Sequence, residues 1–250
     1  MRVIITGAAG AIGSQLTEEL EINHELRLID RRPVKGRKSK VADLSRDASK
    51  SLWYNWMRSH WSDAFQGAEV VVHLAASIHP MAPWKEIFPN NIQATWNIMQ
   101  AAARHGVSRV VFASSNWAVK ARENELAPAC YAPTGPKIDS DAPPCPVNAY
   151  GLSKAFGETT GRMFVDEKHL SSFVAVRIGN YIPERPDDKL LRTRWIGVQD
   201  MRSLLRRCVE ANFTGFHVVY GVSAQPTSPY DLSKTNRLLS WEPRQTSMDS

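Results

Sequence analysis

The first thirty residues constrain the fold of this chain more than any other stretch. Arg2–Thr6 is a short run of mostly β-branched residues, which suits a buried parallel strand. It leads directly into the pattern G-x-x-G-x-x-G, formed by Gly7, Gly10 and Gly13. A helix from near Ala11 to Leu20 and a second strand at 25–29 are expected to follow. The stretch therefore predicts a βαβ unit with a glycine turn after its first strand.

The glycine turn predicts a dinucleotide site. Gly7 permits the tight turn, Gly10 lets the backbone approach a pyrophosphate, and Gly13 lets the helix pack close to the strand. The pyrophosphate would lie on the free N–H groups at the start of the helix, beside Ala11 and Ile12. Glycine turns also close ordinary βα units. The strand before this turn, the helix after it and an acid farther on favour dinucleotide binding over that alternative.

The acid is Asp30, at the end of the second strand. A carboxylate roughly 20 residues after the glycines suits the adenosine ribose hydroxyls of NAD. Within a net charge of +6, six basic residues crowd the next segment: Arg31, Arg32, Lys35, Arg37, Lys38 and Lys40. They could hold the 2′-phosphate of NADP, attract nucleic acid, or form a solvated loop. We favour the loop, keep NADP as the lesser alternative to NAD, and expect no nucleic-acid partner because no binding module accompanies the charge.

Composition limits the class of protein. With 250 residues, 43% of them hydrophobic, the chain can bury a sizeable core as one domain, or as one domain and a small lobe. It shows no leader-like segment and no apolar run of about 18 residues, so a soluble, cytoplasmic protein without a membrane partner is expected. Cys130, Cys145 and Cys208 are odd in number and lack metal-like spacing, so we expect neither disulfides nor a metal site.

Strand and helix patterns alternate along the rest of the chain. Strands are expected at 41–44, 69–74, 109–113, 173–178 and 216–220, and helices at 90–105, 149–166 and 200–212. A further helix would carry Trp53, Trp56 and Trp61. Segment 124–146 is rich in proline and is expected to be a loop that passes the site. This alternation predicts an α/β fold with a Rossmann-type, doubly wound parallel sheet. Residues 1–178 would form the cofactor-binding domain, and 179–250 a small C-terminal substrate lobe, with parts returning to the core.

Three residues suggest proton-transfer chemistry. Tyr150 and Lys154 are four residues apart, so on a helix they share one face. Tyrosine normally titrates near pH ~10, but a neighbouring ammonium stabilises its phenolate. Ser115 follows a neighbouring strand and could hydrogen-bond the same substrate oxygen. The Tyr-x-x-x-Lys spacing alone also fits an exposed helix face. Its occurrence together with the glycine turn and the serines favours a catalytic set.

Five segments, in this order, resemble an extended short-chain dehydrogenase/reductase, that is, the NAD-dependent epimerase/dehydratase family. They are TGAAGAIG at 6–13, HLAAS at 73–77, FASSN at 112–116, YGLSK at 150–154 and RIGN at 177–180. Within that family, the chain is most similar to the uronate dehydrogenases, in the segments FASSN, YGLSKAFGE, VRIGNYIPE, Trp195 to Asp200, and LLSWEP near the C-terminus. Three positions depart from that subgroup: Trp117 replaces a histidine, Asn180 replaces a serine, and Lys189 stands where a carboxylate-binding arginine is expected, with Arg192 and Arg194 close by.

The resemblance implies NAD-dependent oxidation of a hydroxyl of a sugar acid or related polyol. Tyr150 would be the base, Lys154 would lower its pKa and hold the nicotinamide ribose, and Ser115 would orient the substrate oxygen. The implied cofactor contacts are Gly7, Gly10, Ala11, Ile12, Gly13, Asp30, Arg31, Asp43, Leu44, Leu74, Ala75, Ala76, Asn91 and Ile178. The implied substrate contacts are Ser77, Asn116, Asn180 and Lys189. A homodimer formed by the helices at 90–105 and 149–166 is also implied.

Two other functions fit the same residues. A nucleotide-sugar epimerase or dehydratase would reduce and reoxidise a tightly bound NAD within one turnover. A non-catalytic, cofactor-sensing protein could share the scaffold, because a fold alone does not establish catalysis. Such a protein has little use for a Ser, Tyr and Lys set, so these residues weigh against that alternative.

Overall fold

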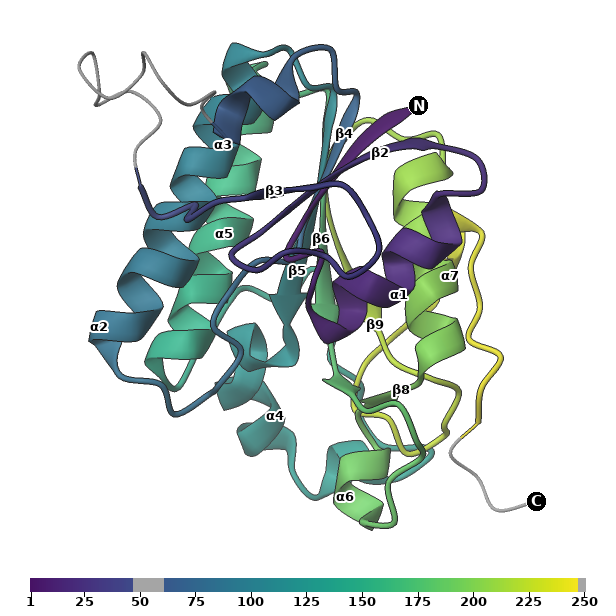
Figure 1. Ribbon diagram of the computed structural model, residues 1–250. Helices are drawn as coiled ribbons and strands as arrows, with labels where there is room; N and C mark the ends of the chain where they lie inside the picture. The colour runs from purple at the N-terminus through teal and green to yellow at the C-terminus, as the bar shows by residue number, and fades with distance from the viewer. Residues whose placement is uncertain (47–60, 247–250) are drawn as a thin grey trace.

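A parallel seven-stranded sheet forms the centre of the molecule (Figure 1). The computed structural model describes residues 1–46 and 61–246. The strands are β1 (Arg2–Thr6), β2 (Glu25–Asp30), β3 (Ser39–Val41), β4 (Val70–His73), β5 (Arg109–Ser115), β6 (Ser172–Ile178) and β9 (Gly215–Gly221). Their spatial order is β3-β2-β1-β4-β5-β6-β9, so the winding direction reverses between β1 and β4. The predicted doubly wound α/β fold is confirmed, and a ligand is expected at this reversal, beyond the carboxyl ends of the strands.

Helices cover both faces of the sheet, because the strand side chains alternate between two cores. Val3 and Ile5 pack in the same cluster as residues of α1 (Ala11–Leu20) and α7 (Val198–Glu210). Ile4 packs in the opposite cluster, with residues of α3 (Ala94–Arg104) and α5 (Ala149–Asp166). Valine, isoleucine and leucine make up most of the first core, while alanine and aromatic residues share the second core with them. The continuous apolar strands seen in the sequence are therefore buried on both sides, as parallel strands require.

Short elements gather at the carboxyl end of the sheet, below it in Figure 1. They are α2 (Trp84–Ile87), the π-helix η2 (Phe88–Gln93), the 3-10 helices η3 (Asn116–Val119) and η4 (Ala129–Tyr131), α4 (Lys120–Leu126), α6 (Lys189–Arg192), and the two-stranded sheet of β7 (Asn180–Tyr181) and β8 (Trp195–Ile196). A small cluster of buried residues, including Val119, Ile138 and Tyr230, joins segments far apart in sequence. This region surrounds the predicted site.

Several predicted elements differ from the observed ones. The third strand lies at Ser39–Val41, two residues before the predicted segment 41–44. The helix predicted at 90–105 is divided into η2 and α3. Segment 124–146 was expected to be a loop but contains the end of α4 and all of η4. Elements of only one turn or one bridge carry no hydrophobic period, which is why the sequence did not indicate them. Trp53 and Trp56 lie outside the described residues, while Trp61 begins the 3-10 helix η1 (Trp61–Phe65).

Residues 179–246 are shared between the sheet and its carboxyl end. β9 is the seventh strand, α7 packs against α1, and α8 (Ser233–Leu239) lies beside β9. A separate substrate lobe for the remainder stays a prediction. In the two described ranges, no helix has both the length and the apolar character needed to cross a membrane.

Candidate active site

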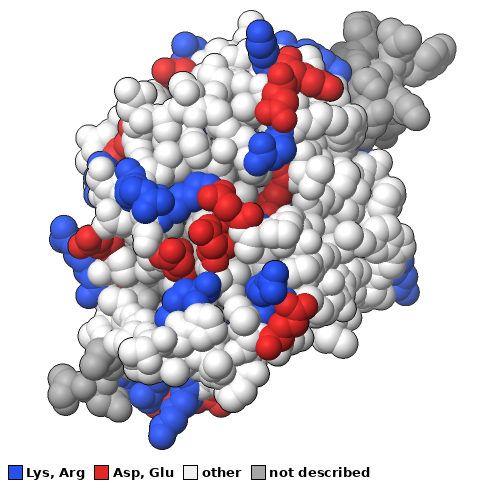
Figure 2. All heavy atoms as spheres, turned by 180° about the vertical axis from the view of Figure 1, so that it is seen from behind, with Lys and Arg blue, Asp and Glu red and all other residues white. Residues whose placement is uncertain are grey.

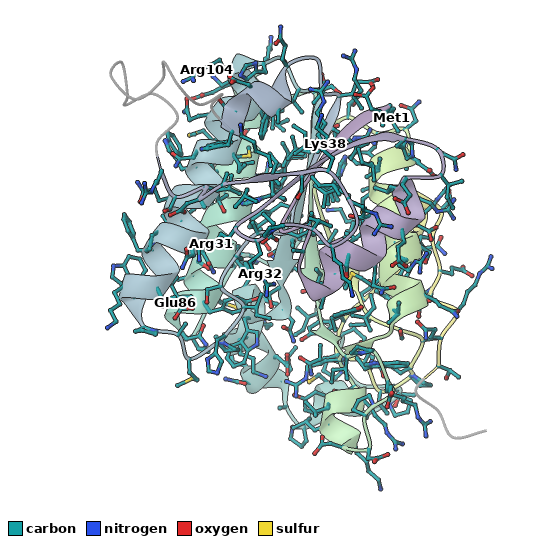
Figure 3. All side chains as sticks on the ribbon, viewed as in Figure 1. Met1, Arg31, Arg32, Lys38, Glu86 and Arg104 are labelled. Carbon is teal, nitrogen blue, oxygen red and sulfur yellow. The ribbon has the colours of Figure 1, made fainter. Side chains whose placement is uncertain are left out.

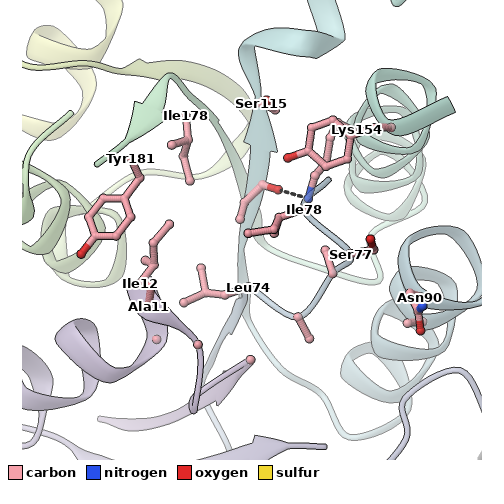
Figure 4. A pocket seen from close by; sticks show the side chains of 18 of the residues that line it. Ala11, Ile12, Leu74, Ser77, Ile78, Asn90, Ser115, Lys154, Ile178 and Tyr181 are labelled. Carbon is pink, nitrogen blue, oxygen red and sulfur yellow. Dashed lines mark hydrogen bonds between the residues drawn. The ribbon is translucent and has the colours of Figure 1, made fainter. Parts of the chain in front are cut away.

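A cavity of about 940 Å³ lies along the carboxyl ends of the strands. Residues after β1, β2, β4, β5 and β6 line it, so it occupies the predicted place at the winding reversal. Figure 4 shows Ala11 and Ile12 at the start of α1 on one side, and Ser77 and Asn90 on the opposite side. The volume is at the upper end of the range for small-molecule sites, which suits a dinucleotide together with a small substrate.

The glycine turn forms the floor of the cavity. Gly7 has φ of +72°, and a Cβ there would lie 2.7 Å from the backbone nitrogen of Ala75. A Cβ on Gly13 would lie 2.2 Å from the carbonyl oxygen of Gly7, so any larger residue would force α1 away from β1. The N-cap of α1 is Gly10, which has no side chain and so provides no acceptor for the first N–H groups of the helix. These donors and the positive end of the helix dipole fit a pyrophosphate.

Asp30 is fixed at the end of β2 by two backbone donors. Its Oδ2 accepts a hydrogen bond from the N–H of Ala9 at 2.9 Å, and its Oδ1 accepts one from the N–H of Arg32 at 3.0 Å. Each carboxylate oxygen can accept a second hydrogen bond. Asp30 also lines the cavity, so both oxygens can bind ribose hydroxyls without losing their backbone partners.

Arg31 and Asp43 form the outer wall at this end. The guanidinium of Arg31 lies 3.8 Å from a carboxylate oxygen of Asp43 and donates to the side-chain oxygen of Asn90. Burial raises the pKa of Asp43, but hydrogen bonds from Ser45 and the charges of Arg31 and Arg46 bring it below its usual value. The carboxylate therefore stays charged. Together with Asp30, these residues fit the adenosine part of NAD.

The three predicted catalytic residues all line the cavity. Figure 4 shows Ser115 and Lys154 at the end away from Ala11 and Ile12. Tyr150 lies in the first turn of α5, which begins after Asn148, whose side-chain oxygen accepts the N–H of Gly151 at 2.7 Å. Ser115 ends β5; its hydroxyl donates to the side-chain oxygen of Asn116 at 3.1 Å and accepts the N–H of Trp117 at 3.3 Å. The ammonium of Lys154 lies 5.5 Å from the centre of the Tyr150 ring.

The protonation of this group differs from the expectation. Burial raises the pKa of Tyr150, and the neighbouring hydroxyl of Ser115 lowers it only in part. Lys154 was expected to lower this pKa, but its ammonium donates to the carbonyl oxygen of Ala113 at 2.8 Å. Burial also lowers the pKa of Lys154 to about 8. Desolvation therefore dominates both groups, because each is enclosed by the sheet and α5.

A buried ion pair supports the end of β5 from behind. Arg177 of β6 donates to both carboxylate oxygens of Glu158 on α5, at 3.0 and 2.8 Å. The hydroxyl of Ser114 donates to the same carboxylate at 2.6 Å. The hydrogen bonds and charge of Glu158 raise the pKa of Arg177 despite the opposing effect of burial. This contact fixes α5, β5 and β6 relative to one another, and Tyr150 and Ser115 with them.

The loop after β4 forms the rim near the catalytic residues. Asn91 was predicted to bind cofactor, but its side chain instead binds the backbone of Ser77, at 2.8 Å to N and 3.0 Å to O. Its neighbour Asn90 lines the cavity. The hydroxyl of Ser77 donates to the carboxylate of Glu86 on α2. Asn91 therefore holds the loop in place, and Ser77 and Glu86 face the site.

The remaining predicted residues lie mainly as expected. Those that line the cavity are Gly7, Gly10, Ala11, Ile12, Gly13, Asp30, Arg31, Asp43, Leu44, Leu74, Ala75, Ala76, Ser77, Ser115, Asn116, Tyr150, Lys154, Ile178 and Asn180. The structure does not bring Lys189 to the cavity. That residue is exposed at the start of α6, whose first turn is capped by Asp188.

Other lining residues were not predicted as contacts. They include Arg32, Ser45, Ile78, Glu86, Asn90, Trp117, Tyr181 and Ile182. Most of these are next in the chain to a predicted residue, namely Arg32, Ser45, Ile78, Asn90, Trp117 and Tyr181. Glu86 carried no signal, because it lies on a four-residue helix within a loop. Within the described ranges, no group of three or more His, Cys, Asp or Glu side chains is arranged to hold a metal ion.

Comparisons with known proteins agree with this geometry. The chain is 33% identical to the NAD-dependent glucose-6-phosphate dehydrogenase of Haloferax volcanii over 251 residues, covering 99% of this chain and 94% of that protein. It is 33% identical to the uronate dehydrogenase of Pseudomonas syringae pv. tomato, covering 92% and 77%. The structure of uronate dehydrogenase from Agrobacterium tumefaciens, as a variant complexed with NAD, superposes with a TM-score of 0.78 at 30% identity, covering 98% of this chain and 85% of that one.

The profile of the NAD dependent epimerase/dehydratase family matches residues 3–199, which include the glycine turn, Asp30 and the three catalytic candidates. The resemblance to this family and the prediction of NAD are therefore confirmed. The chain belongs to the NAD dependent epimerase/dehydratase family, and NAD is its cofactor.

Proposed function

We propose that this chain is a dehydrogenase that oxidises a hydroxyl-bearing carbon of a free sugar or sugar acid. The arrangement of Tyr150, Ser115 and Lys154 at one end of the cavity carries the proposal. The names of relatives that match over most of their length support it. One of these is the L-arabinose 1-dehydrogenase (NAD(P)(+)) of Haloferax volcanii, 29% identical over 98% of this chain and 97% of that protein. That name also suggests the anomeric carbon as the site of oxidation.

The residues divide the chemistry between them. NAD, when bound, accepts the hydride from the substrate carbon. Tyr150 takes the proton of the substrate hydroxyl, so the C–O single bond becomes a double bond as the hydride leaves. Ser115 orients that hydroxyl, since its own hydroxyl lies beside the phenol of Tyr150. Lys154 holds a positive charge near the phenolate and, as in the resembling family, contacts the nicotinamide ribose.

The test is a panel of aldoses, uronic acids and nucleotide sugars incubated with NAD. We expect free NADH to accumulate steadily with a sugar or sugar acid. Turnover of a nucleotide sugar without net NADH would instead indicate the epimerase alternative. UDP-galactose 4-epimerase has the same fold, with a TM-score of 0.72 at 22% identity, and that likeness concerns the fold alone.

Tyr150→Phe tests the assignment of the base. The variant should lose about 10²–10⁴-fold in kcat, the usual contribution of general acid–base catalysis. It should still bind NADH, measured by fluorescence titration, because only the phenol oxygen is removed. Residual turnover within tenfold of the wild type would contradict this role for Tyr150.

A homodimer in the cytoplasm completes the proposal. Leu152 and Met163 are exposed apolar residues on α5, and Trp96 is one on the neighbouring α3. Figure 2 shows a broad area without charged side chains on the side of the molecule where α3 and α5 lie. Such an area suits a two-fold interface of paired helices. All three cysteines are unpaired, which is typical of a reducing compartment.

A further inference from the structure

The charged side chains that line the cavity differ between its adenosine end and its substrate end. Asp30, Arg31, Arg32 and Asp43 line the end expected to hold the adenosine. Beyond them, the only charged side chains among the described lining residues are Lys154 and Glu86. The ammonium of Lys154 is buried and donates to the carbonyl oxygen of Ala113. Glu86 is exposed at the rim, on α2 (Figure 3). At the substrate end, therefore, the cation is buried and bound to a backbone carbonyl, whereas the carboxylate of Glu86 is exposed and has no ion pair in the described structure.

Two cations outside the cavity, Lys120 beside the Trp117 ring and Arg194, are already paired. Lys120 and Arg194 each bind Oε1 of the fully buried Glu123, at 2.7 and 2.8 Å. Burial raises the pKa of Glu123, but hydrogen bonds from Lys120 and the tyrosines, with the charge of Arg194, bring it below its usual value. Glu123 therefore remains a carboxylate, and neither cation lines the cavity.

Two further cations do not supply a counter-charge. Lys189, where the resemblance places a carboxylate-binding residue, is exposed and outside the cavity. Arg31 donates to Asn90, one helical turn after Glu86, but it lies 3.8 Å from Asp43 and faces the adenosine end. An anionic group on a substrate would thus meet Glu86 without a partner.

We propose that the substrate of this site is an uncharged polyhydroxylated molecule, a free aldose or polyol, and that Glu86 is a residue that selects against anionic sugars. This inference rests on the proposed function and narrows its substrate class. Glu86 already accepts the hydroxyl of Ser77, and its carboxylate has further capacity to accept a sugar hydroxyl. The ring of Trp117 lines the same end and offers an apolar face to the C–H groups of a sugar. Repulsion of an unpaired anion adds discrimination against the alternative substrate.

Matched pairs of substrates test the inference with the wild-type protein and NAD. The pairs are glucose with glucuronate, glucose with glucose 6-phosphate, and galactose with galacturonate. We expect kcat/KM to be higher for the neutral member by about tenfold or more, since a carboxylate without a counter-charge repels a second anion at close range. Added salt should raise kcat/KM for the anionic member and leave that of the neutral one unchanged, because it screens the repulsion.

The variant Glu86→Gln tests the contribution of the Glu86 charge apart from that of the other pocket residues. The ratio of neutral to anionic kcat/KM should fall several-fold in this variant. Glu125→Gln is the matched control, because it removes the same charge from an exposed site on α4, where Glu125 pairs only with Arg122 in the described structure. Its ratio should equal that of the wild type.

The outcomes are distinct. A uronate or sugar phosphate that is used as well as its neutral partner would overturn the inference and leave the proposed function standing. A ratio that Glu86→Gln changes no more than Glu125→Gln does would overturn the role of Glu86. Absence of NADH with every sugar, neutral or anionic, would instead overturn the proposed function itself, and the inference would fall with it.

Discussion

Burial and the neighbouring hydroxyl of Ser115 act in opposite directions on the pKa of Tyr150. Burial raises the pKa of Tyr150, and Ser115 is the group that lowers it. A base must be deprotonated, so kcat/KM should rise with pH as Tyr150 ionises. Ser115→Ala removes the lowering contact, so the rising limb should move to higher pH. Ser114→Ala should leave the limb in place, because the Ser114 hydroxyl donates to Glu158. An unchanged limb in Ser115→Ala would show that the contact does not act on the phenol.

Asp30 decides the choice between NAD and NADP. Its carboxylate faces the cavity at the end of β2 and would repel a 2′-phosphate, while Arg31 is partly neutralised by Asp43. The wild type should therefore prefer NAD. Asp30→Asn keeps one side-chain acceptor for the backbone but removes the charge, so the NAD to NADP ratio of kcat/KM should fall by roughly tenfold, or about 1.4 kcal/mol. Better efficiency of the wild type with NADP would show that Arg31 and Arg32 outweigh the carboxylate.

The sequence predicted the site residues at or next to the end of a strand. It did not predict those on the loops that bend back over the edge of the sheet. Gly7 directly follows β1, and Asp30 and Ser115 are the last residues of β2 and β5, so local sequence determines which edge of the sheet they reach. Glu86 and Tyr181 reach the cavity only because the chain after β4 and after β6 bends back over that edge. No period or motif within those loops records the bend, so only the three-dimensional structure reveals these contacts.

At the scale of elements, the contact of Glu158 with Arg177 fastens α5 to the sheet. Both side chains are almost completely buried. Glu158→Ala would leave the guanidinium of Arg177 without its carboxylate, so we expect a loss of about 3–5 kcal/mol in the free energy of unfolding. Glu125→Ala breaks an exposed pair with Arg122 and should cost less than about 1 kcal/mol. Urea unfolding curves measure both. Equal losses in the two variants would show that the buried pair contributes no special stability.

The length and period of an element determined how well it was predicted. The helix α5 was predicted with its observed bounds, because it spans 18 residues. The neighbouring helix was placed correctly, but its start is the π-helix η2, which has a wider turn than an α-helix. Asn90, within this π-helix, lines the cavity, while Asn91, which the resemblance implied as a cofactor contact, binds the backbone of Ser77. A sequence pattern based on 3.6 residues per turn does not predict a π-helix.

At the scale of the whole molecule, the two sides of the sheet have different roles. The side of α1 and α7 is tied together by ion pairs, such as those of Arg202 and Arg206 with Glu19. The side of α3 and α5 exposes apolar residues. The cavity lies at the edge between them, and the first turn of α5 supplies Tyr150 to it. An interface on α5 would therefore bury the outer face of the same helix that carries the base.

The last prediction is that Met163→Glu yields a monomer. Met163 lies on the exposed face of α5, three turns after Leu152, and a carboxylate there would be buried without a partner in a two-fold interface. Ile22→Glu is the matched control, because Ile22 is an exposed residue just after α1, on the opposite side of the sheet (Figure 1). Light scattering at micromolar concentration should give the mass of a dimer for the wild type and Ile22→Glu, and that of a monomer for Met163→Glu. A monomeric wild type would show that the apolar face of α3 and α5 is not a dimer interface. A dimer that survives Met163→Glu would place the interface on another surface.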